Sequence, residues 1–173
     1  MMKLNFFPRG IIVLWMFFWP TAASMSQETC REKKTAPDDV LSLAEKTLDA
    51  IRNNDVGFVA TLPDPTGIYV GFDASKMTAT QFRKELAAKN GVYCVIFDSS
   101  CAKEFQGSPR PSSLRQMLIA QPVTTTMVMQ DAQGVSQVVS VTVRKAANPH
   151  EDLFTLYFRQ VGKHWRLQHI DYV

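Results

Sequence analysis

Apolar residues in the first half of the chain recur at helical spacing. A helix over 38–53 with one buried face is predicted by five of them: Val40, Leu41, Ala44, Leu48 and Ile51. A shorter helical piece is predicted for 56–62. Thr78 or Thr80 can cap a third helix that runs to Lys89, where Asn90 and Gly91 are typical of a left-handed end.

Two short apolar runs separate these helices, and both are predicted as strands, at 68–72 and 92–97. Further along, Ser113 and Gln116 have the spacing of a capping box, which predicts a short helix to Ala120. The first half of the chain is therefore mostly helical, with single strands between the helices.

From Pro122 onward, apolar and polar residues alternate with a period of two. This predicts four strands that follow one another through short turns, at 123–130, 135–145, 153–161 and 164–173. Helices gathered ahead of such a meander indicate the α+β class, with the helices packed on one face of a curved antiparallel sheet.

The first 23 residues have the three parts of a secretory signal peptide. Lys3 and Arg9 form a positive region, 11–19 is an uninterrupted apolar run, and 21–24 offers small residues for cleavage. The apolar run is too short for the roughly 20 residues of a membrane-spanning helix. We therefore expect a cleaved leader rather than an uncleaved membrane anchor, and a periplasmic or secreted protein.

The rest of the chain divides into two parts. Residues 24–37 are mostly polar and are predicted to be a flexible lead-in, whereas 38–173 is long enough for a single domain. The formal net charge is +3, of which Lys3 and Arg9 of the leader supply two. A nearly neutral body gives no electrostatic reason to expect nucleic acid as a partner.

Three cysteines follow the leader: Cys30, Cys94 and Cys101. Export permits disulfides. A bridge between Cys94 and Cys101 would close a short loop at the end of the strand predicted for 92–97, and it is the favoured pairing. Cys30 would then be free or available to a second chain. The rival pairing, Cys30 with Cys101, would tie the lead-in to the domain.

The order of elements and the closing hairpin together resemble the NTF2-like superfamily. The most telling segment is 154–167, FTLYFRQVGKHWRL, with an aromatic strand, a Gly-Lys turn and Trp-Arg-Leu at the start of the last strand. The resemblance implies a cone-shaped α+β fold, found both in enzymes and in proteins that bind small molecules or other proteins. Residues 93–101 and 109–111 depart from that pattern. A cystatin-like arrangement is the structural alternative.

The best catalytic candidates lie near the end of the chain. Residues two apart in a strand share a face, so Asp171 can sit beside His169 and raise the basicity of its imidazole. Trp165 and Leu167 are expected on that face too, which would place the pair at an apolar cavity, with Tyr157 as a proton donor. The alternative is a cross-strand polar cluster without catalysis.

Metal and cofactor chemistry have no motif in this sequence. The three histidines, at 150, 164 and 169, have no spacing that presents two nitrogens from one face, and neither a CxxC pair nor a glycine-rich phosphate loop occurs. We therefore expect no metal and no cofactor. Met127 and Met129 alternate along one strand and are expected to line the core or a cavity.

The loop over 98–111 points to a protein partner. It is polar, rooted at the expected Cys94–Cys101 bridge and stiffened by two prolines, and Asp98, Lys103 and Arg110 are its candidate contact residues. A rigid loop on a stable scaffold loses little freedom on binding. The sequence thus favours an exported, non-enzymatic protein that holds or inhibits a partner protein, as an immunity protein does. The alternative is a small-molecule binder or acid/base enzyme that uses the cone.

Overall fold

The computed structural model describes residues 37–71, 75–102, 112–132 and 136–172, all of which belong to one compact unit. The predicted signal peptide and, except for Pro37, the lead-in lie outside the described residues. So do Cys30, Lys103 and Arg110, and the predictions made for them stay predictions.

Six helices are present in the described residues. They are α1 Asp38–Arg52, α2 Val56–Val59, α3 Ala79–Ala88, α4 Val92–Ile96, α5 Ser99–Ala102 and α6 Leu114–Ala120. The expected buried face of α1 is confirmed at four of its five positions, since Val40, Ala44, Leu48 and Ile51 are buried and Leu41 is half-buried. The predicted Thr78 cap is also confirmed, because its side chain accepts a hydrogen bond from the Gln81 N–H at 3.1 Å.

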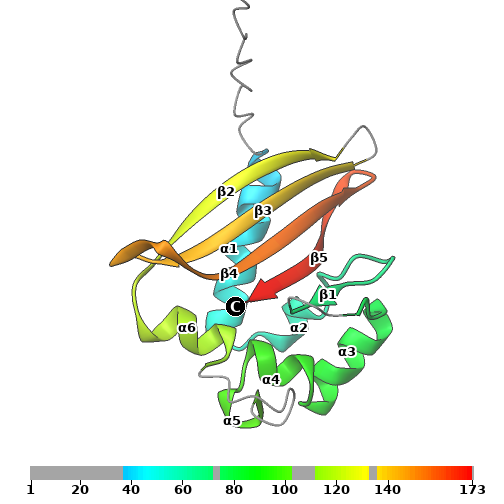
Figure 1. Cartoon of the computed structure of the whole chain (residues 1–173). Helices are drawn as coiled ribbons and strands as arrows, with labels where there is room; N and C mark the ends of the chain where they lie inside the picture. Colours follow the sequence, from blue (N-terminus) through cyan, green and yellow to red (C-terminus); the bar gives the residue numbers. More distant parts are fainter. Residues whose placement is uncertain (1–36, 72–74, 103–111, 133–135, 173) are drawn as a thin grey trace, which may run out of the picture. The chain divides into compact units, whose positions relative to one another are not determined.

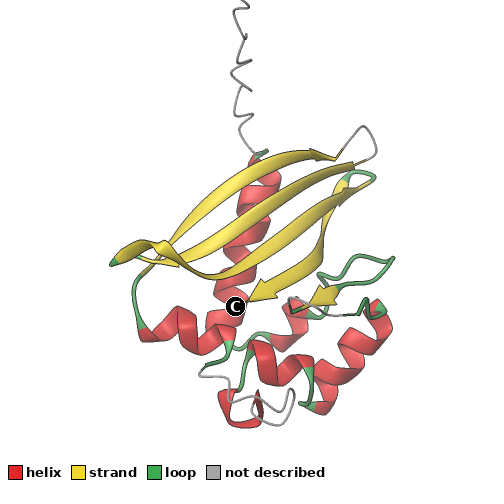
Figure 2. Cartoon of the chain, in the orientation of Figure 1, coloured by secondary structure: helices red, strands yellow, loops and turns green. Residues whose placement is uncertain are grey.

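Five strands form one sheet in the order β1-β5-β4-β3-β2 (Figures 1 and 2). They are β1 Tyr69–Val70, β2 Val123–Ala132, β3 Ser136–Lys145, β4 Asn148–Val161 and β5 His164–Tyr172. β1 runs parallel to β5, and the other neighbours are antiparallel. Helices with a largely antiparallel sheet confirm the α+β class.

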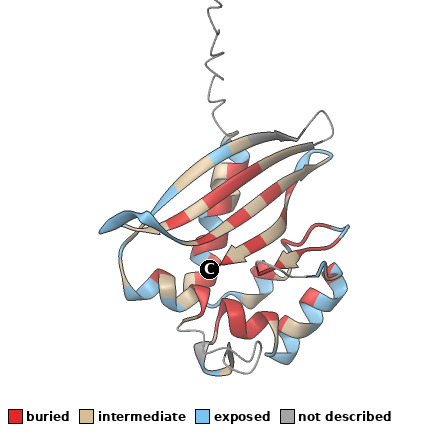
Figure 3. Ribbon diagram, viewed as in Figure 1, coloured by how far each residue is buried: buried red, intermediate tan, exposed pale blue. Residues whose placement is uncertain are grey.

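The core lies on one face of the sheet, which we call the inner face. Figure 3 shows buried positions alternating with half-buried ones along much of β4 and β5, as a period of two requires, whereas on β3 Ser140 is buried together with Val139 and Val141. Val141, Leu156 and Phe158 are 0% exposed and pack in the same core as residues of α1, α3, α4 and α6. We call the opposite, half-exposed face the outer face.

The strand predicted for 92–97 is wrong, because this segment forms α4. All five α4 residues are buried, and α4 packs against both α3 and α6. A short run that is apolar at every position has no period to read, so burial on all sides fits a core helix as well as a core strand. The end of α3 also differs in detail, since Lys89 itself takes the left-handed conformation, with φ of 52°.

We predict that Ser113→Ala will destabilise the fold through α6. Ser113 is fully buried, and its hydroxyl accepts a hydrogen bond from the Gln116 N–H at 3.3 Å, which confirms the helix start expected there. Losing such a cap lowers the free energy of unfolding by about 1 kcal/mol, measurable by urea denaturation. Ser112→Ala is the matched control, and an equal loss in both variants would show that the cap contributes nothing.

Candidate functional site

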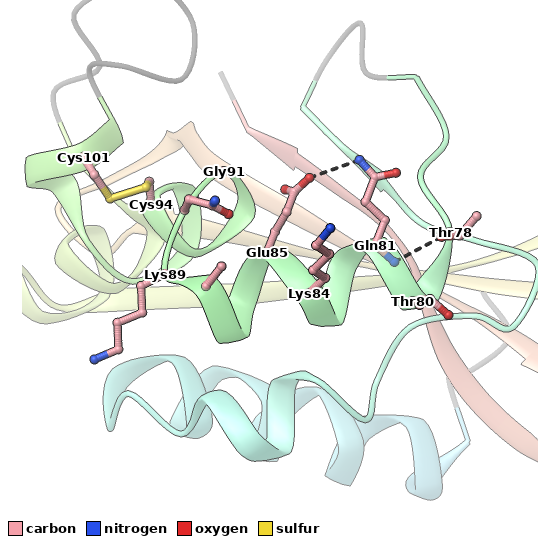
Figure 4. A pocket seen from close by; sticks show the side chains of 11 residues that line it. Thr78, Thr80, Gln81, Lys84, Glu85, Lys89, Gly91, Cys94 and Cys101 are labelled. Atoms are coloured by element: carbon pink, nitrogen blue, oxygen red, sulfur yellow. Dashed lines mark hydrogen bonds between the residues drawn. A yellow bond between two sulfur atoms is a disulfide. The ribbon is translucent and has the colours of Figure 1, made fainter.

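A groove of about 830 Å³ runs along α3 and ends at a disulfide (Figure 4). Its walls come from α3, the turn at 89–91, Cys94 of α4 and Cys101 of α5. Thr80, Lys84 and Ala88 line it at intervals of four residues, so that they form one stripe of the helix. The groove therefore follows α3 over its length.

The groove contains one acidic and two basic side chains, and they differ in whether they are hydrogen-bonded within the protein. The carboxylate of Glu85 accepts hydrogen bonds from Gln81 Nε2 and from the Val92 N–H, each at 3.1 Å, and thereby ties α3 to α4. Lys84 and Lys89 are exposed. The groove therefore carries two exposed lysines and one half-buried carboxylate that is already hydrogen-bonded within the protein.

The disulfide joins Cys94 and Cys101, as predicted, with the two Cα atoms 5.2 Å apart. That separation lies well within the range of disulfide geometry. The bridge connects α4 to α5 rather than a strand end to a turn, and it rules out the rival pairing of Cys101 with Cys30. Cys94 is 3% exposed, so the bridge anchors α5 to a buried residue.

Asp98 is the one predicted loop contact within the described residues. Its carboxylate accepts hydrogen bonds from the Ser100 hydroxyl at 2.7 Å and from the Ser100 N–H at 2.8 Å, and these hold its pKa below the ordinary value. Asp98 thus lies just before α5 and holds the start of that helix through Ser100. Its role in binding a partner remains a prediction.

The three catalytic candidates do come together in space. The Tyr157 and His169 rings stack with their centroids 5.2 Å apart, and the Tyr69 ring meets His169 edge-on at 5.9 Å. His169 Nε2 lies 3.1 Å from the carbonyl oxygen of Gly71. Asp171 is close enough to act electrostatically on Tyr157.

The expected place of this cluster beside Trp165 and Leu167 is wrong. Gln168 is an extra residue in the pairing of β4 with β5, because Tyr157 pairs with His169 while Phe158 pairs with Leu167. Such a bulge reverses the alternation of faces along a strand. The cluster consequently lies on the outer face, half-buried, whereas Trp165 and Leu167 are buried in the core.

The chemistry open to this cluster is limited by its surroundings. Burial and, secondarily, the charge of Asp171 raise the pKa of Tyr157, so its phenol keeps its proton at neutral pH. Asp171 Oδ1 is buried without a hydrogen-bond partner among the described residues. The cluster could exchange protons with a ligand, yet it lines neither the α3 groove nor the two smaller hollows of about 380 and 390 Å³.

A buried ion pair on the outer face joins Asp64 and Arg159, which no local pattern in the sequence indicates. Asp64, 0% exposed, accepts hydrogen bonds from the Thr66 N–H at 2.7 Å, from the Thr66 hydroxyl at 2.8 Å and from Arg159 Nε at 2.6 Å. Burial alone would raise the pKa of Asp64, but these bonds and the Arg159 charge outweigh it and lower the pKa. The pair fastens the turn at 63–67 to β4.

In the part of the chain that the structure describes, no group of three or more His, Cys, Asp and Glu side chains could hold a metal ion. Among the same residues, no helix has both the length and the apolar character needed to cross a membrane.

Comparison with known proteins gives a weak structural likeness. No family model matches the chain, and no curated protein does. A variant of a protein named Rd1NTF2_05 is 16% identical, over 79% of this chain and 98% of its own, with a TM-score of 0.43. An NTF2-like protein from Cytophaga hutchinsonii is 14% identical, over 78% of this chain and 93% of its own, with a TM-score of 0.42.

A third similar structure is a protein of unknown function with a cystatin-like fold from Nostoc punctiforme. It is 11% identical, over 78% of this chain and 86% of its own, with a TM-score of 0.37. The resemblance to NTF2-like proteins predicted from the sequence, with a cystatin-like arrangement as its alternative, is thus confirmed as a weak likeness of fold. Similarity at this level names no activity for the chain.

Proposed function

We propose that this chain is an exported, non-enzymatic protein that binds a partner protein in the groove along α3. The partner is a secreted or cell-envelope enzyme, and binding inhibits that enzyme in the periplasm, in the manner of an immunity protein. The observation that carries the proposal is the groove, with its firmly held walls and the disulfide at its end.

The walls of the groove are held in place before any partner binds. The start of α3 is capped by Thr78, Glu85 joins α3 to α4 by a hydrogen bond to the backbone, and the disulfide joins α4 to α5. Binding to such a surface orders few groups, so little conformational entropy opposes it. This supports recognition of a large partner by a preformed surface.

The charge of the groove supports an acidic partner segment. Lys84 and Lys89 are exposed, while Glu85 is engaged in hydrogen bonds within the protein. Complementary charge steers association and selects among partners. We therefore propose that a segment rich in Asp and Glu lies along α3.

The alternative use of a cone cavity has less support. The inner face of the sheet, which would line such a cavity, carries core side chains such as Leu156 and Phe158, each 0% exposed. The Tyr157–His169–Asp171 cluster faces the other way. These observations favour a surface site over an internal one.

We predict that the double variant Lys84→Glu, Lys89→Glu will bind its partner at least about tenfold more weakly. Reversing two charges that face an acidic segment adds repulsion where there was attraction, and tenfold corresponds to about 1.4 kcal/mol. The tagged chain, purified from an oxidising compartment, is first used to capture envelope and secreted proteins of its source. The affinity for any stoichiometric partner is then measured by calorimetry, together with that enzyme's activity.

Two control variants accompany this measurement. Lys46→Glu with Lys163→Glu makes the same change of charge at exposed lysines elsewhere, and His169→Ala removes the central ring of the outer cluster. Both should keep the affinity of the unmodified chain. An equal loss in the Lys46 and Lys163 variant would remove the groove from the proposal. A copurifying small molecule that is lost with His169→Ala would favour the ligand-binding or acid/base alternative.

A further inference from the structure

Among the described residues, no strand pairs with the edge of β2 that faces away from β3, and β2 lacks the features that normally protect such an edge. β2 is ten residues long and ends the strand order, whereas the other edge strand, β1, has two residues. Its stretch 123–130, VTTTMVMQ, contains no charged residue, proline or glycine. Long, uncharged edge strands of β-branched and apolar residues are ready templates for pairing with another strand.

The side chains of β2 are also less covered than those of its neighbours. On β3, Val139, Val141 and Val143 are 0% exposed. On β2, none of the described side chains is buried, and Figure 3 shows the contrast between the two strands. Val128 on the outer face is 37% exposed, and among the described residues Ile119 is the other exposed large apolar side chain. Met127 and Met129, expected in the core or a cavity, are half-buried at its margin.

The direction of the β2 backbone groups follows from two hydrogen bonds. The carbonyl of Val128 accepts a bond from Ser140 Oγ at 3.3 Å, and that of Pro122 accepts one from the Ala146 N–H at 3.0 Å. Even-numbered residues of β2 therefore direct their backbone groups toward β3. Because backbone groups alternate along a strand, Thr125, Met127 and Met129 direct theirs toward the open edge.

We propose that β2 pairs antiparallel with β2 of a second copy of this chain, around a two-fold axis at Val128. In this register Val128 faces Val128 of the second copy on the outer face, and Met127 faces Met129 on the inner face. The odd-numbered residues form the hydrogen bonds between copies. Asp131, the only charged residue of β2, falls opposite Thr125, so no like charges meet.

We propose a second copy of this chain as the partner of β2 because residues on either side of Val128 match one another when two β2 strands run antiparallel. A two-fold interface requires that residue i contact j while j contacts i, and here apolar residues meet apolar residues on both faces. Shifting the axis to Met127 would instead place Val128 opposite Thr126 and Met129 opposite Thr125. The two five-stranded sheets would join into one continuous sheet, and the β2 edge of each copy would be covered by the other.

Disulfide trapping tests the register directly. In the full chain, expressed with its own leader and carrying Cys30→Ser, Val128→Cys places two cysteines at a pair whose Cα atoms lie about 4.5 Å apart, within disulfide range. Thr124→Cys is the matched control on the same strand and face, and its two cysteines would be about 26 Å apart. We expect oxidised dimer from Val128→Cys and none from Thr124→Cys.

Sedimentation velocity supplies an independent measurement without new cysteines. The unmodified chain should be a dimer, and Val128→Lys, which sets two like charges on the axis, should weaken dimerisation by at least about tenfold. Thr124→Lys adds the same charge away from the axis and should remain dimeric. A monomeric unmodified chain, equal cross-linking of both cysteine variants, or equal dimerisation of both lysine variants would each overturn the proposal.

Discussion

Asp64→Asn is expected to lower the free energy of unfolding by about 3 kcal/mol. Asp64 is fully buried and Arg159, at the other end of the ion pair, is 24% exposed, so the substitution strands a mostly buried guanidinium. Removing one member of a buried pair destabilises strongly because the remaining charge keeps its desolvation penalty. Urea denaturation followed by circular dichroism measures the loss.

An exposed ion pair on the same sheet gives the matched control. Arg144 and Asp152 are 31% and 47% exposed, and exposed pairs contribute about 0 to 1 kcal/mol. Asp152→Asn should therefore change the free energy of unfolding by less than about 1 kcal/mol. Similar losses in Asp64→Asn and Asp152→Asn would mean that burial does not set the strength of the Asp64 contact.

The Asp64 contribution should also depend on pH in a defined direction. The pKa of Asp64 is lowered in the folded state, so the folded chain binds its proton less readily than the unfolded chain. The stability gained is complete above the unfolded pKa, about 3.9, and is lost as pH falls through the lower folded pKa. The difference between Asp64→Asn and the unmodified chain should thus be largest near pH 7 and shrink below about pH 4.

Replacing both bridged cysteines, Cys94→Ala with Cys101→Ala, is expected to lower the free energy of unfolding by about 2 to 3 kcal/mol. The bridge joins two residues seven positions apart in sequence, and the loop-entropy treatment gives about that value for a loop this short. The melting temperature should fall by several degrees. Calorimetry of the two proteins under oxidising conditions makes the measurement.

A reductant separates the bridge from the packing of the cysteine side chains. It should lower the melting temperature of the unmodified chain toward that of the double alanine variant and leave the variant itself unchanged. If the unmodified chain melted at the same temperature with and without reductant, the bridge would contribute nothing to the stability of the groove.

Most elements could be predicted because their patterns are local and periodic. The amphipathic face of α1, the cap at Ser113 and the alternation along β4 each depend on neighbours within one element. The two errors arise where that locality fails. The segment 92–97 is apolar at every position, and Gln168 adds one residue whose effect on the faces of β5 appears only in its pairing with β4.

The candidate groove could not be predicted from the sequence for the same reason. Its walls combine α3 with α4 and α5, and a segment predicted as a strand could not indicate a helix beside α3. Asp64 and Arg159 are 95 residues apart in sequence, so only the fold brings them together. The disulfide could be predicted because a short separation between two cysteines already limits the possible pairings.

The place of β5 within the sheet bears on when the protein can fold. The last strand in sequence lies between β4 and the parallel β1, and it also holds the 63–67 turn through the hydrogen bond from the Asp64 N–H to the Leu167 carbonyl. Contacts between residues 63–70 and 167–170 cannot form until nearly the whole chain has been synthesised. A nascent chain would therefore complete its core only after β5 has emerged from the ribosome.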